Sequence, residues 1–320
     1  MWKLKSFRDF LSRFKKLDLS RQLLTFSFLL LTSLYPGHNS LQTIVLNPGL
    51  VKSYDVSHSD FMIYPVGDGT KVPPLSAVGV VVQDLGSHAT IFERQADKYM
   101  LPASTTKIMT ALVAIDAWPD LSTVLTVKND DRAIGQTIDL FRGEQLTVES
   151  LLKGILIHSG NDAALALADN YPGGYSAFVT AMNAKARSLH LDNTTYKNPS
   201  GIEQYGHVTT PRDLAILAGV AMSNQIIAEI VNTKFAVIKD VTGVIIHPLE
   251  TTNELLGVID GLRGLKTGWT ENAGECLVSY VERDGHPVII VVLGSLDRFG
   301  ETSKLVDWVY DHHRWITPEL

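Results

Sequence analysis

The order of the predicted secondary structure constrains the fold of this chain more than any other feature. Two runs typical of strands, 77–85 and 89–94, flank Gly86-Ser87-His88 and predict a hairpin. The next strand-like runs lie near the end of the chain, at 235–239, 244–247, 264–266, 275–282 and 287–294. We therefore predict one antiparallel sheet whose strands come from both ends of the chain.

The stretch between these strands is mostly helical by its hydrophobic spacing. At 147–158 apolar residues recur at the spacing of one helix face, and Thr147 stands where an N-cap is expected. Further helical patterns lie at 104–118, 162–170, 175–189, 210–222 and 225–231, and a closing helix is predicted at 303–315. The fold class is therefore α/β of the α+β kind, an antiparallel sheet flanked by helices with a mostly helical insert. We expect it to form one domain at 76–317.

The residues before this domain divide into three parts. Residues 1–21 carry seven Lys or Arg against two Asp, a net charge of +5, and are followed by an apolar stretch without charged side chains at 22–35. Residues 36–75 are rich in Pro, Ser, Gly and His and show no helical or strand period. A basic flank before a short apolar stretch is typical of an export signal, and positive charge keeps that end in the cytoplasm. We expect a basic cytoplasmic leader, a signal peptide or signal anchor, and an extracytoplasmic tether, in that order.

Two observations bear on whether the apolar segment is cut off. No small-x-small pair typical of a cleavage site follows Tyr35, which favours an uncleaved segment. Against this, the segment 22–35 is shorter than the about 20 apolar residues that are normally needed to cross a bilayer. We favour an uncleaved anchor. The domain is then expected in the cell envelope, held at the cytoplasmic membrane through 22–35 or secreted after cleavage.

Charge and the scarcity of metal-binding patterns exclude several classes of function. Without the leader, the chain has 21 basic and 32 acidic side chains, a balance of −11 that argues against nucleic acid as a partner. The one cysteine, Cys276, excludes an intramolecular disulfide and any CxxC site. No histidine lies in an HExxH pattern or another close metal spacing, so no metal site is expected.

A candidate serine nucleophile lies in the segment Ser104-Thr105-Thr106-Lys107. Lys107 follows Ser104 by three residues, so the two side chains share a helix face and come within reach of each other. The same spacing occurs in the leader and on the solvated face of the helix at 147–158. Ser104 instead opens a predicted helix, where free N–H groups and the helix dipole stabilise negative charge. On this pattern alone, an N-cap is the better explanation of Ser104.

Two further motifs follow in the chain. Ser159-Gly160-Asn161 lies in a turn between helical segments, and Lys266-Thr267-Gly268 ends a strand-like run. Each has an ordinary structural explanation when taken singly. In this order, the three motifs together resemble those of the serine D-Ala-D-Ala carboxypeptidases, the low-molecular-mass penicillin-binding proteins of peptidase family S11. The resemblance continues at 101–107, 143–161, 198–202, 206–214 and 264–274, and so covers 77–310.

The resemblance implies a β-lactamase/DD-peptidase-like fold and a role for each motif. Ser104 would be the nucleophile and Lys107 its general base, which requires a lysine pKa lowered by burial and by a second cation. Ser159 would relay the proton to the leaving nitrogen. Asn161 would position the substrate amide and Lys107.

The K-T-G motif would form the substrate-binding side. Lys266 and Thr267 would bind the terminal carboxylate of the substrate, and Gly268 would let the strand edge approach the substrate backbone. The resemblance also implies an oxyanion hole made by the backbone N–H groups of Ser104 and Trp269.

The implied activity is removal of the terminal D-alanine from peptidoglycan stem peptides through an acyl-enzyme on Ser104, without a cofactor and with β-lactams as acylating inhibitors. A DD-endopeptidase stays open, as does a β-lactamase, although no ExxLN pattern lies between Asn161 and Lys266. A non-catalytic wall-binding or β-lactam-sensing module would be expected to lose Ser104 or Lys107. Many relatives carry a second, all-β domain, and since this sequence ends soon after Trp315 we expect no C-terminal β domain.

Overall fold

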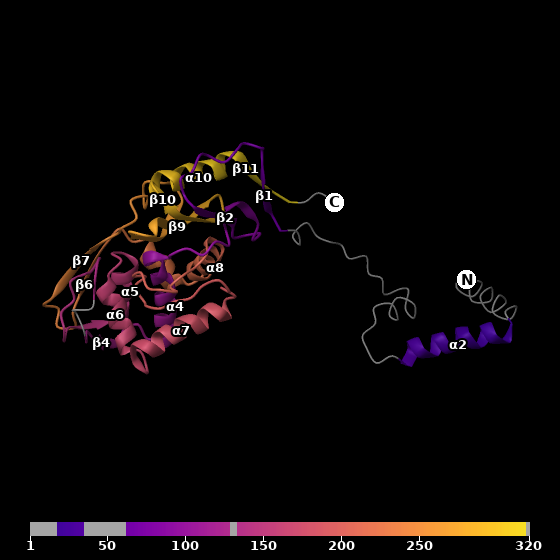
Figure 1. Cartoon of the computed structure of the whole chain (residues 1–320), viewed down its shortest axis with the longest axis horizontal. Coiled ribbons are helices and arrows are strands. Elements are labelled where there is room, and N and C mark those ends of the chain that lie inside the picture. Colours follow the sequence, from indigo (N-terminus) through magenta and orange to yellow (C-terminus); the bar gives the residue numbers. More distant parts are fainter. Residues whose placement is uncertain (1–17, 35–61, 129–132, 318–320) are drawn as a thin grey trace. The chain divides into compact units, whose positions relative to one another are not determined.

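The structure is a computed structural model that describes residues 18–34, 62–128 and 133–317. The chain divides into two units, Met1–Asp60 and Phe61–Leu320. The first contributes the helix α2 (Leu19–Leu34), which begins at the end of the expected leader and overlaps the segment expected to be the signal or anchor (Figure 1). Among the described helices, no single one is long and apolar enough to cross a membrane; the bent pair 211–222 and 225–231 meets that test jointly, by length and composition.

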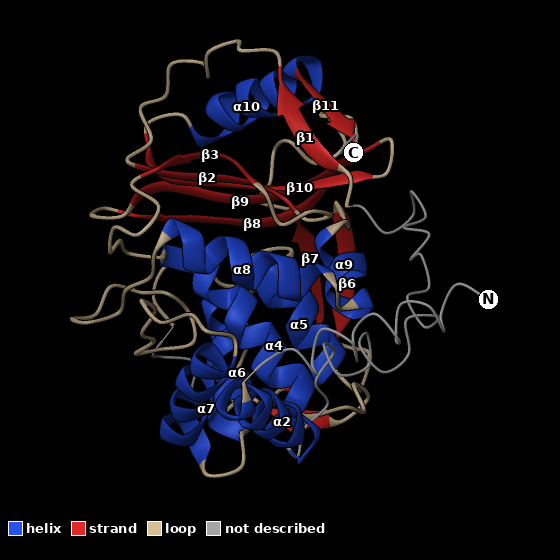
Figure 2. Ribbon diagram, turned by 90° about the vertical axis from the view of Figure 1, so that its right-hand side faces the viewer, coloured by secondary structure: helices blue, strands red, loops and turns tan. Residues whose placement is uncertain are grey.

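A five-stranded antiparallel sheet forms the centre of the second unit (Figure 2). Its strand order is β3-β2-β10-β9-β8, so the hairpin from the start of the domain pairs with a meander from its end. This arrangement confirms the sheet of distant segments that the sequence predicted. The strands are β2 (Gly79–Asp84), β3 (Thr90–Arg94), β8 (Leu262–Thr270), β9 (Gly274–Arg283) and β10 (His286–Ser295).

Helices cover both faces of this sheet (Figure 2). Alternation along β2 sends Val81 into the core shared with the helical insert, and Val80 and Val82 into the core beneath α10. The helices are α4 (Lys107–Ala117), α5 (Val148–Leu156), α6 (Asn161–Asn170), α7 (Gly174–Ser188), α8 (Pro211–Met222), α9 (Gln225–Val231) and α10 (Arg298–His312). As predicted, the Thr147 side chain caps α5 by accepting from Ser150 N.

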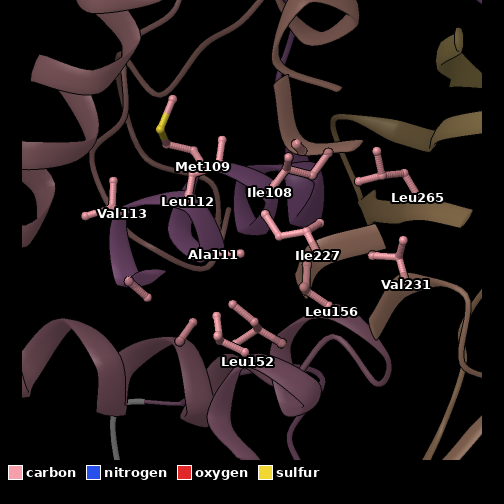
Figure 3. Packing of buried hydrophobic residues seen from close by; sticks show 14 of the residues in the cluster. Ile108, Met109, Ala111, Leu112, Val113, Leu152, Leu156, Ile227, Val231 and Leu265 are labelled. Carbon is pink, nitrogen blue, oxygen red and sulfur yellow. The ribbon is translucent and has the colours of Figure 1, made fainter. Parts of the chain in front are cut away.

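The helix α4 lies in the middle of the insert and is buried on nearly all sides. Figure 3 shows its residues Ile108 and Leu112 packed among Leu152, Leu156 and other apolar side chains from α5 and α9. A helix that is apolar all round is stable only when it is enclosed in this way. Its first residue therefore has a fixed position inside the protein.

Two elements differ from the predicted arrangement of strands. β6 (Phe235–Lys239) and β7 (Ile246–Glu250) pair with each other in a separate two-stranded sheet, although the sequence predicted them in the central one. Their inward side chains, such as Ile238 and Leu249, are buried against the helical insert. A further small sheet pairs β4 (Val124–Thr126) with β5 (Gln145–Thr147).

The end of the chain also differs from its prediction of a helix at 303–315. α10 begins earlier, at Arg298, because the Asp297 side chain caps it by accepting from Gly300 N. The helix gives way to β11 (His313–Ile316), whose Trp315 stacks on His286 with ring centroids 4.5 Å apart. β11 pairs with β1 (Tyr64–Gly67), so part of the segment expected as a tether belongs to the compact unit that begins at Phe61.

Candidate active site

Ser104 lies in a turn that leads directly into the buried helix α4. The turn is a 3-10 helix, η2 (Ala103–Thr106), and α4 starts at Lys107, so Ser104 does not open the α-helix as the sequence predicted. Ala103 has a φ of +48°, which bends the chain just before the serine. The side chain of Thr105 donates to Pro102 O at 2.6 Å and closes this bend.

Lys107 Nζ lies 2.9 Å from Ser104 Oγ, inside the protein. It donates to Asn161 Oδ1 at 2.6 Å and to Ser200 O at 2.7 Å. Burial, followed by the nearby charge of Lys266, holds the pKa of Lys107 well below its usual value. With two of its hydrogens on these oxygens, a neutral amine directs its lone pair at the serine hydroxyl.

The S-G-N motif lies against the same serine. Asn161 begins α6, and its Nδ2 donates to Ile134 O, which turns Oδ1 toward Lys107. Ser159 is buried and has a left-handed backbone, with a φ of +68°. That backbone bend brings both Ser159 and Asn161 to the wall of one cleft.

The K-T-G motif lies on β8, on the other side of Ser104. Lys266 is 1% exposed, and its Nζ donates to Thr267 O at 3.0 Å. Burial, with a smaller effect of the Arg298 charge, lowers the pKa of Lys266 from 10.5 to about 7. A Cβ on Gly268 would come within 3.0 Å of Ser104 N, so this glycine lets the strand edge approach the turn that carries Ser104.

A cleft of about 590 Å³ joins these groups. Six of the eight residues predicted for the site line it, whereas Lys107 and Lys266 lie buried behind its surface. Trp269 is 62% exposed at the cleft. The lining residues are Ser104, Ile134, Gly135, Gln136, Ser159, Asn161, Ser200, Gly201, Ile202, Glu203, Thr252, Thr267, Gly268, Trp269, Thr270, Glu271, Asn272 and Arg298.

Arg298 is a cleft residue that the sequence analysis missed. Its Nη1 donates to Gly268 O at 2.9 Å, and its backbone N–H donates to Glu275 Oε2 at 2.8 Å. Its Nε is buried without a hydrogen-bond partner among the described residues. No motif marks this arginine in the sequence, because only the packing of α10 on β9 and β10 brings it to the cleft. Within the described ranges, no group of three or more His, Cys, Asp or Glu could hold a metal ion.

The buried Lys266 predicts an unusual dependence of stability on pH. Between its folded pKa of about 7 and its ordinary value of 10.5, the unfolded chain binds a proton that the folded chain does not. The free energy of unfolding should therefore rise with pH across this window. Below pH 7 Lys266 is protonated in both states, so the destabilisation caused by burying its charge is fully present. We expect Lys266→Met to stabilise the fold by a few kcal/mol at pH 6, on the order that such a shift implies, and much less at pH 10. Melting curves of both proteins across this range measure the difference, and equal gains at both pH values would contradict the assignment.

Comparison with known proteins identifies the family of this chain. The family model of D-alanyl-D-alanine carboxypeptidases, peptidase S11, matches residues 68–296. The carboxypeptidases DacF of Bacillus subtilis and DacC of Escherichia coli are 31% and 33% identical over 77% and 78% of the chain. The matches cover 66% and 64% of those relatives, so the chain spans about two thirds of their length. An E. coli relative named D-alanyl-D-alanine endopeptidase is 31% identical over 74% of the chain and 78% of its own length.

Solved structures share the fold. The Streptomyces K15 DD-transpeptidase is 33% identical, with a TM-score of 0.70 over 76% of this chain and 100% of that one. Penicillin-binding protein D2 of Listeria monocytogenes, solved in an ampicillin-bound form, is 31% identical, with a TM-score of 0.67 over 75% of this chain and 100% of that one. The architecture predicted from the sequence is thus confirmed by its structural relatives. This chain belongs to the peptidase S11 family, the D-alanyl-D-alanine carboxypeptidases.

Proposed function

We propose that this chain is a serine D-alanyl-D-alanine carboxypeptidase that removes the terminal D-alanine of peptidoglycan stem peptides. The observation that carries the proposal is the buried Lys107 amine, 2.9 Å from Ser104 Oγ and hydrogen-bonded to Asn161 Oδ1. A serine hydroxyl is a poor nucleophile at neutral pH and needs an adjacent base. A lysine whose pKa is lowered by burial supplies that base without a histidine or a metal.

The first half of the reaction forms an acyl-enzyme. Lys107 Nζ accepts the Ser104 proton as Oγ attacks the carbonyl carbon of the D-Ala-D-Ala bond. The oxyanion that develops is stabilised by the backbone N–H groups of Ser104 and Trp269. Ser159 then passes the proton to the nitrogen of the departing D-alanine, and the C–N bond breaks.

The terminal carboxylate of the substrate is held on the β8 side of the cleft. Thr267 and Arg298 both line the cleft, and Lys266 adds positive charge behind them. The Thr267 hydroxyl and the Arg298 guanidinium, which line the cleft, make the contacts, while the buried lysine acts through its field. Arg298 thereby joins the pair that the sequence analysis assigned to this carboxylate.

The second half of the reaction hydrolyses the acyl-enzyme and regenerates the free enzyme. Lys107 takes a proton from water as the water oxygen attacks the ester carbon. It then gives this proton to Ser104 Oγ as the ester C–O bond breaks, so that Ser104 leaves as the alcohol and Lys107 is again a neutral amine. β-Lactams present a strained amide to the same serine, and we propose that they acylate Ser104. The ampicillin-bound form of the related Listeria protein supports this proposal.

The function is tested by the products of three substrates. We expect free D-alanine from a peptide ending in D-Ala-D-Ala and slow release of a labelled penicillin adduct. Cleavage of cross-linked peptide dimers without free D-alanine would instead identify an endopeptidase, as one relative is named. Fast hydrolysis of the penicillin would identify a β-lactamase, and binding of both ligands without any product would identify a wall-binding or sensing module.

We also propose that the catalytic unit works outside the cytoplasmic membrane, held by the segment 22–35. The basic charge before this segment and its apolar composition support the proposal. N-terminal analysis of the exported protein tests it, because an anchored protein retains residues 1–35. A mature protein that starts after Tyr35 would contradict permanent anchoring and indicate secretion after cleavage.

A further inference from the structure

The segment 134–141 forms one wall of the cleft and sets the orientation of Asn161. Ile134 and Gln136 line the cleft, and Gln136 O accepts from Asn161 N at 2.8 Å. Ile134 O accepts from Asn161 Nδ2, so Asn161 Oδ1 faces Lys107 Nζ at 2.6 Å. Moving this wall would therefore free the amide whose oxygen holds the catalytic base.

Asp162 fixes the middle of the segment. Its Oδ2 accepts from Ile138 N and from Leu140 N, each at 3.0 Å, and it is buried. Asp162 follows Asn161 directly at the start of α6. The residue that holds the wall and the residue whose amide contacts Lys107 therefore belong to the same helix.

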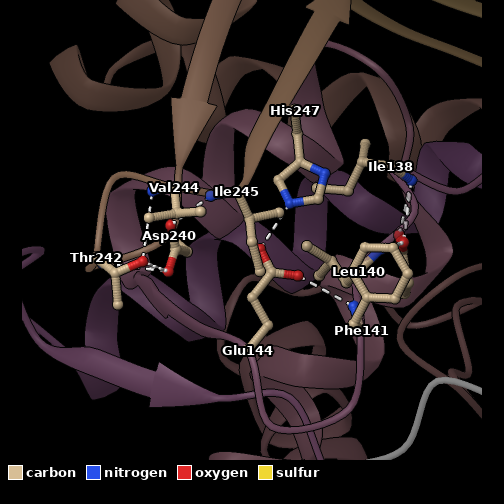
Figure 4. A network of polar contacts seen from close by, with 10 residues as sticks. Ile138, Leu140, Phe141, Glu144, Asp240, Thr242, Val244, Ile245 and His247 are labelled. Carbon is tan, nitrogen blue, oxygen red and sulfur yellow. Dashed lines mark hydrogen bonds and ion pairs between the residues drawn. The ribbon is translucent and has the colours of Figure 1, made fainter.

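A buried hydrogen bond between Glu144 and His247 fixes the far end of the segment (Figure 4). Glu144 Oε2 accepts from Phe141 N at 3.0 Å, and Glu144 Oε1 lies 2.6 Å from His247 Nε2. Both side chains are almost completely buried. Glu144 directly precedes β5, and His247 lies on β7. A buried polar group is stable only when it is hydrogen-bonded. Loss of His247 therefore leaves Glu144 Oε1 without this partner, and loss of Glu144 leaves His247 Nε2 without it.

β7 supports the wall at a second point. His158 Nε2 lies 2.7 Å from Gln136 Nε2, and His158 Nδ1 lies 3.0 Å from Glu250 O at the end of β7. An imidazole that accepts from Gln136 through Nε2 donates through Nδ1 to the carbonyl. The β6–β7 hairpin, which lies outside the central sheet, is thus linked to both ends of the wall, through His158 at one end and Glu144 at the other.

We propose that Glu144 and His247 are a positioning pair for the reaction: they hold the segment 134–141 against Asn161, so that its amide oxygen stays on Lys107. Neither residue lines the cleft or touches the reacting atoms. The proposal rests on the proposed function, since it concerns the base of that reaction. It gives the β6–β7 hairpin, which lies outside the central sheet, a role in the reaction.

The test compares variants of the pair in the full-length protein. We expect Glu144→Ala and His247→Ala to slow acylation by a labelled penicillin roughly 10- to 100-fold, the cost of a small misplacement of a catalytic group. Glu144→Gln keeps an acceptor for Phe141 N, and His247→Gln keeps a donor for Glu144, so both should stay within about threefold of wild type. Rates are measured below each variant's unfolding transition.

Asp84 provides a matched control. It is equally buried and accepts from a backbone N–H, Ser87 N at 2.7 Å, and from a ring N–H, Trp315 Nε1 at 2.8 Å, but it does not line the cleft. Asp84→Ala should lower stability without slowing acylation of the folded protein. Equal slowing by Asp84→Ala and Glu144→Ala would reduce the pair to ordinary structural support and overturn the proposal.

Two further measurements separate this proposal from the proposed function. In an Asn161→Ala background, Glu144→Ala should slow acylation little further, because its effect runs through that amide. A full additional loss would overturn the proposal.

The NMR signals of the Asn161 side-chain amide report on the positioning pair without turnover, and they should shift in Glu144→Ala but not in Asp84→Ala. If wild type proved inactive while these signals shifted as expected, the proposed function would fail and the positioning role would stand. Unchanged signals would overturn the positioning role, whatever the activity.

Discussion

Replacing Lys107 by arginine is expected to slow acylation of the protein by about 10²- to 10⁴-fold, the usual contribution of a general base. An arginine side chain stays protonated in proteins and cannot accept the Ser104 proton. The wild-type amine can, because burial and the charge of Lys266 hold its pKa far below 10.5. The measurement is the rate of penicillin acylation and of D-alanine release at neutral pH.

The chain contains its own control for this variant. Lys153 follows Ser150 at the same spacing, but it lies on α5 and forms an exposed i,i+4 ion pair with Glu149 at 2.6 Å. Lys153→Arg should leave both rates unchanged, since it lies outside the cleft. If Lys107→Arg kept rates within a few fold of wild type, Lys107 would be a structural cation and another base would be required.

Gly201→Ala is expected to have the largest effect on stability among the glycine variants of the site. Gly201 has a φ of +87°, and a Cβ there would lie 1.8 Å from Ala103 O. Backbone strain and steric overlap together should cost roughly 3–5 kcal/mol of unfolding free energy. Any relief of the overlap moves either the turn that carries Ser104 or the Ser200 carbonyl that binds Lys107, so the surviving folded protein should acylate slowly as well.

A matched variant at Gly243 separates the cost of backbone strain from the cost of steric overlap. It also has a positive φ, +74°, but a Cβ there meets no atom within 4 Å. Gly243→Ala should therefore cost only the backbone strain, about 1 kcal/mol, and leave acylation unchanged. Denaturant titrations of the two variants give the comparison; equal losses would mean that the contact with Ala103 contributes nothing.

The positions of the three candidate motifs were predictable because each motif is local and its chemistry is carried by residue type. Ser104 and Lys107 are close in sequence, and the S-G-N and K-T-G motifs lie where a helix begins and where a strand runs, so the fold brings all three to one cleft. The pairing of the first hairpin with the last strands was also predictable, since a hairpin with a buried face needs partners.

Other contacts between distant segments were not predictable from these patterns. Alternation identified β6 and β7 as strands, but it does not say which sheet a strand joins. Arg298 reaches the cleft only through the packing of α10, and the Glu144–His247 pair joins residues 103 apart in the chain. The same limit applies to β1, whose four residues become a strand by pairing with β11 at the other end of the domain.

The central claim is that Ser104 is the nucleophile, and the most direct measurement is to locate the covalent adduct. After reaction with a labelled penicillin, peptide mass spectrometry of the wild type should place the label on the peptide that contains Ser104. Ser104→Ala should give no adduct and no D-alanine, while melting like the wild type. A label on any other residue, or full D-alanine release by Ser104→Ala, would contradict the account.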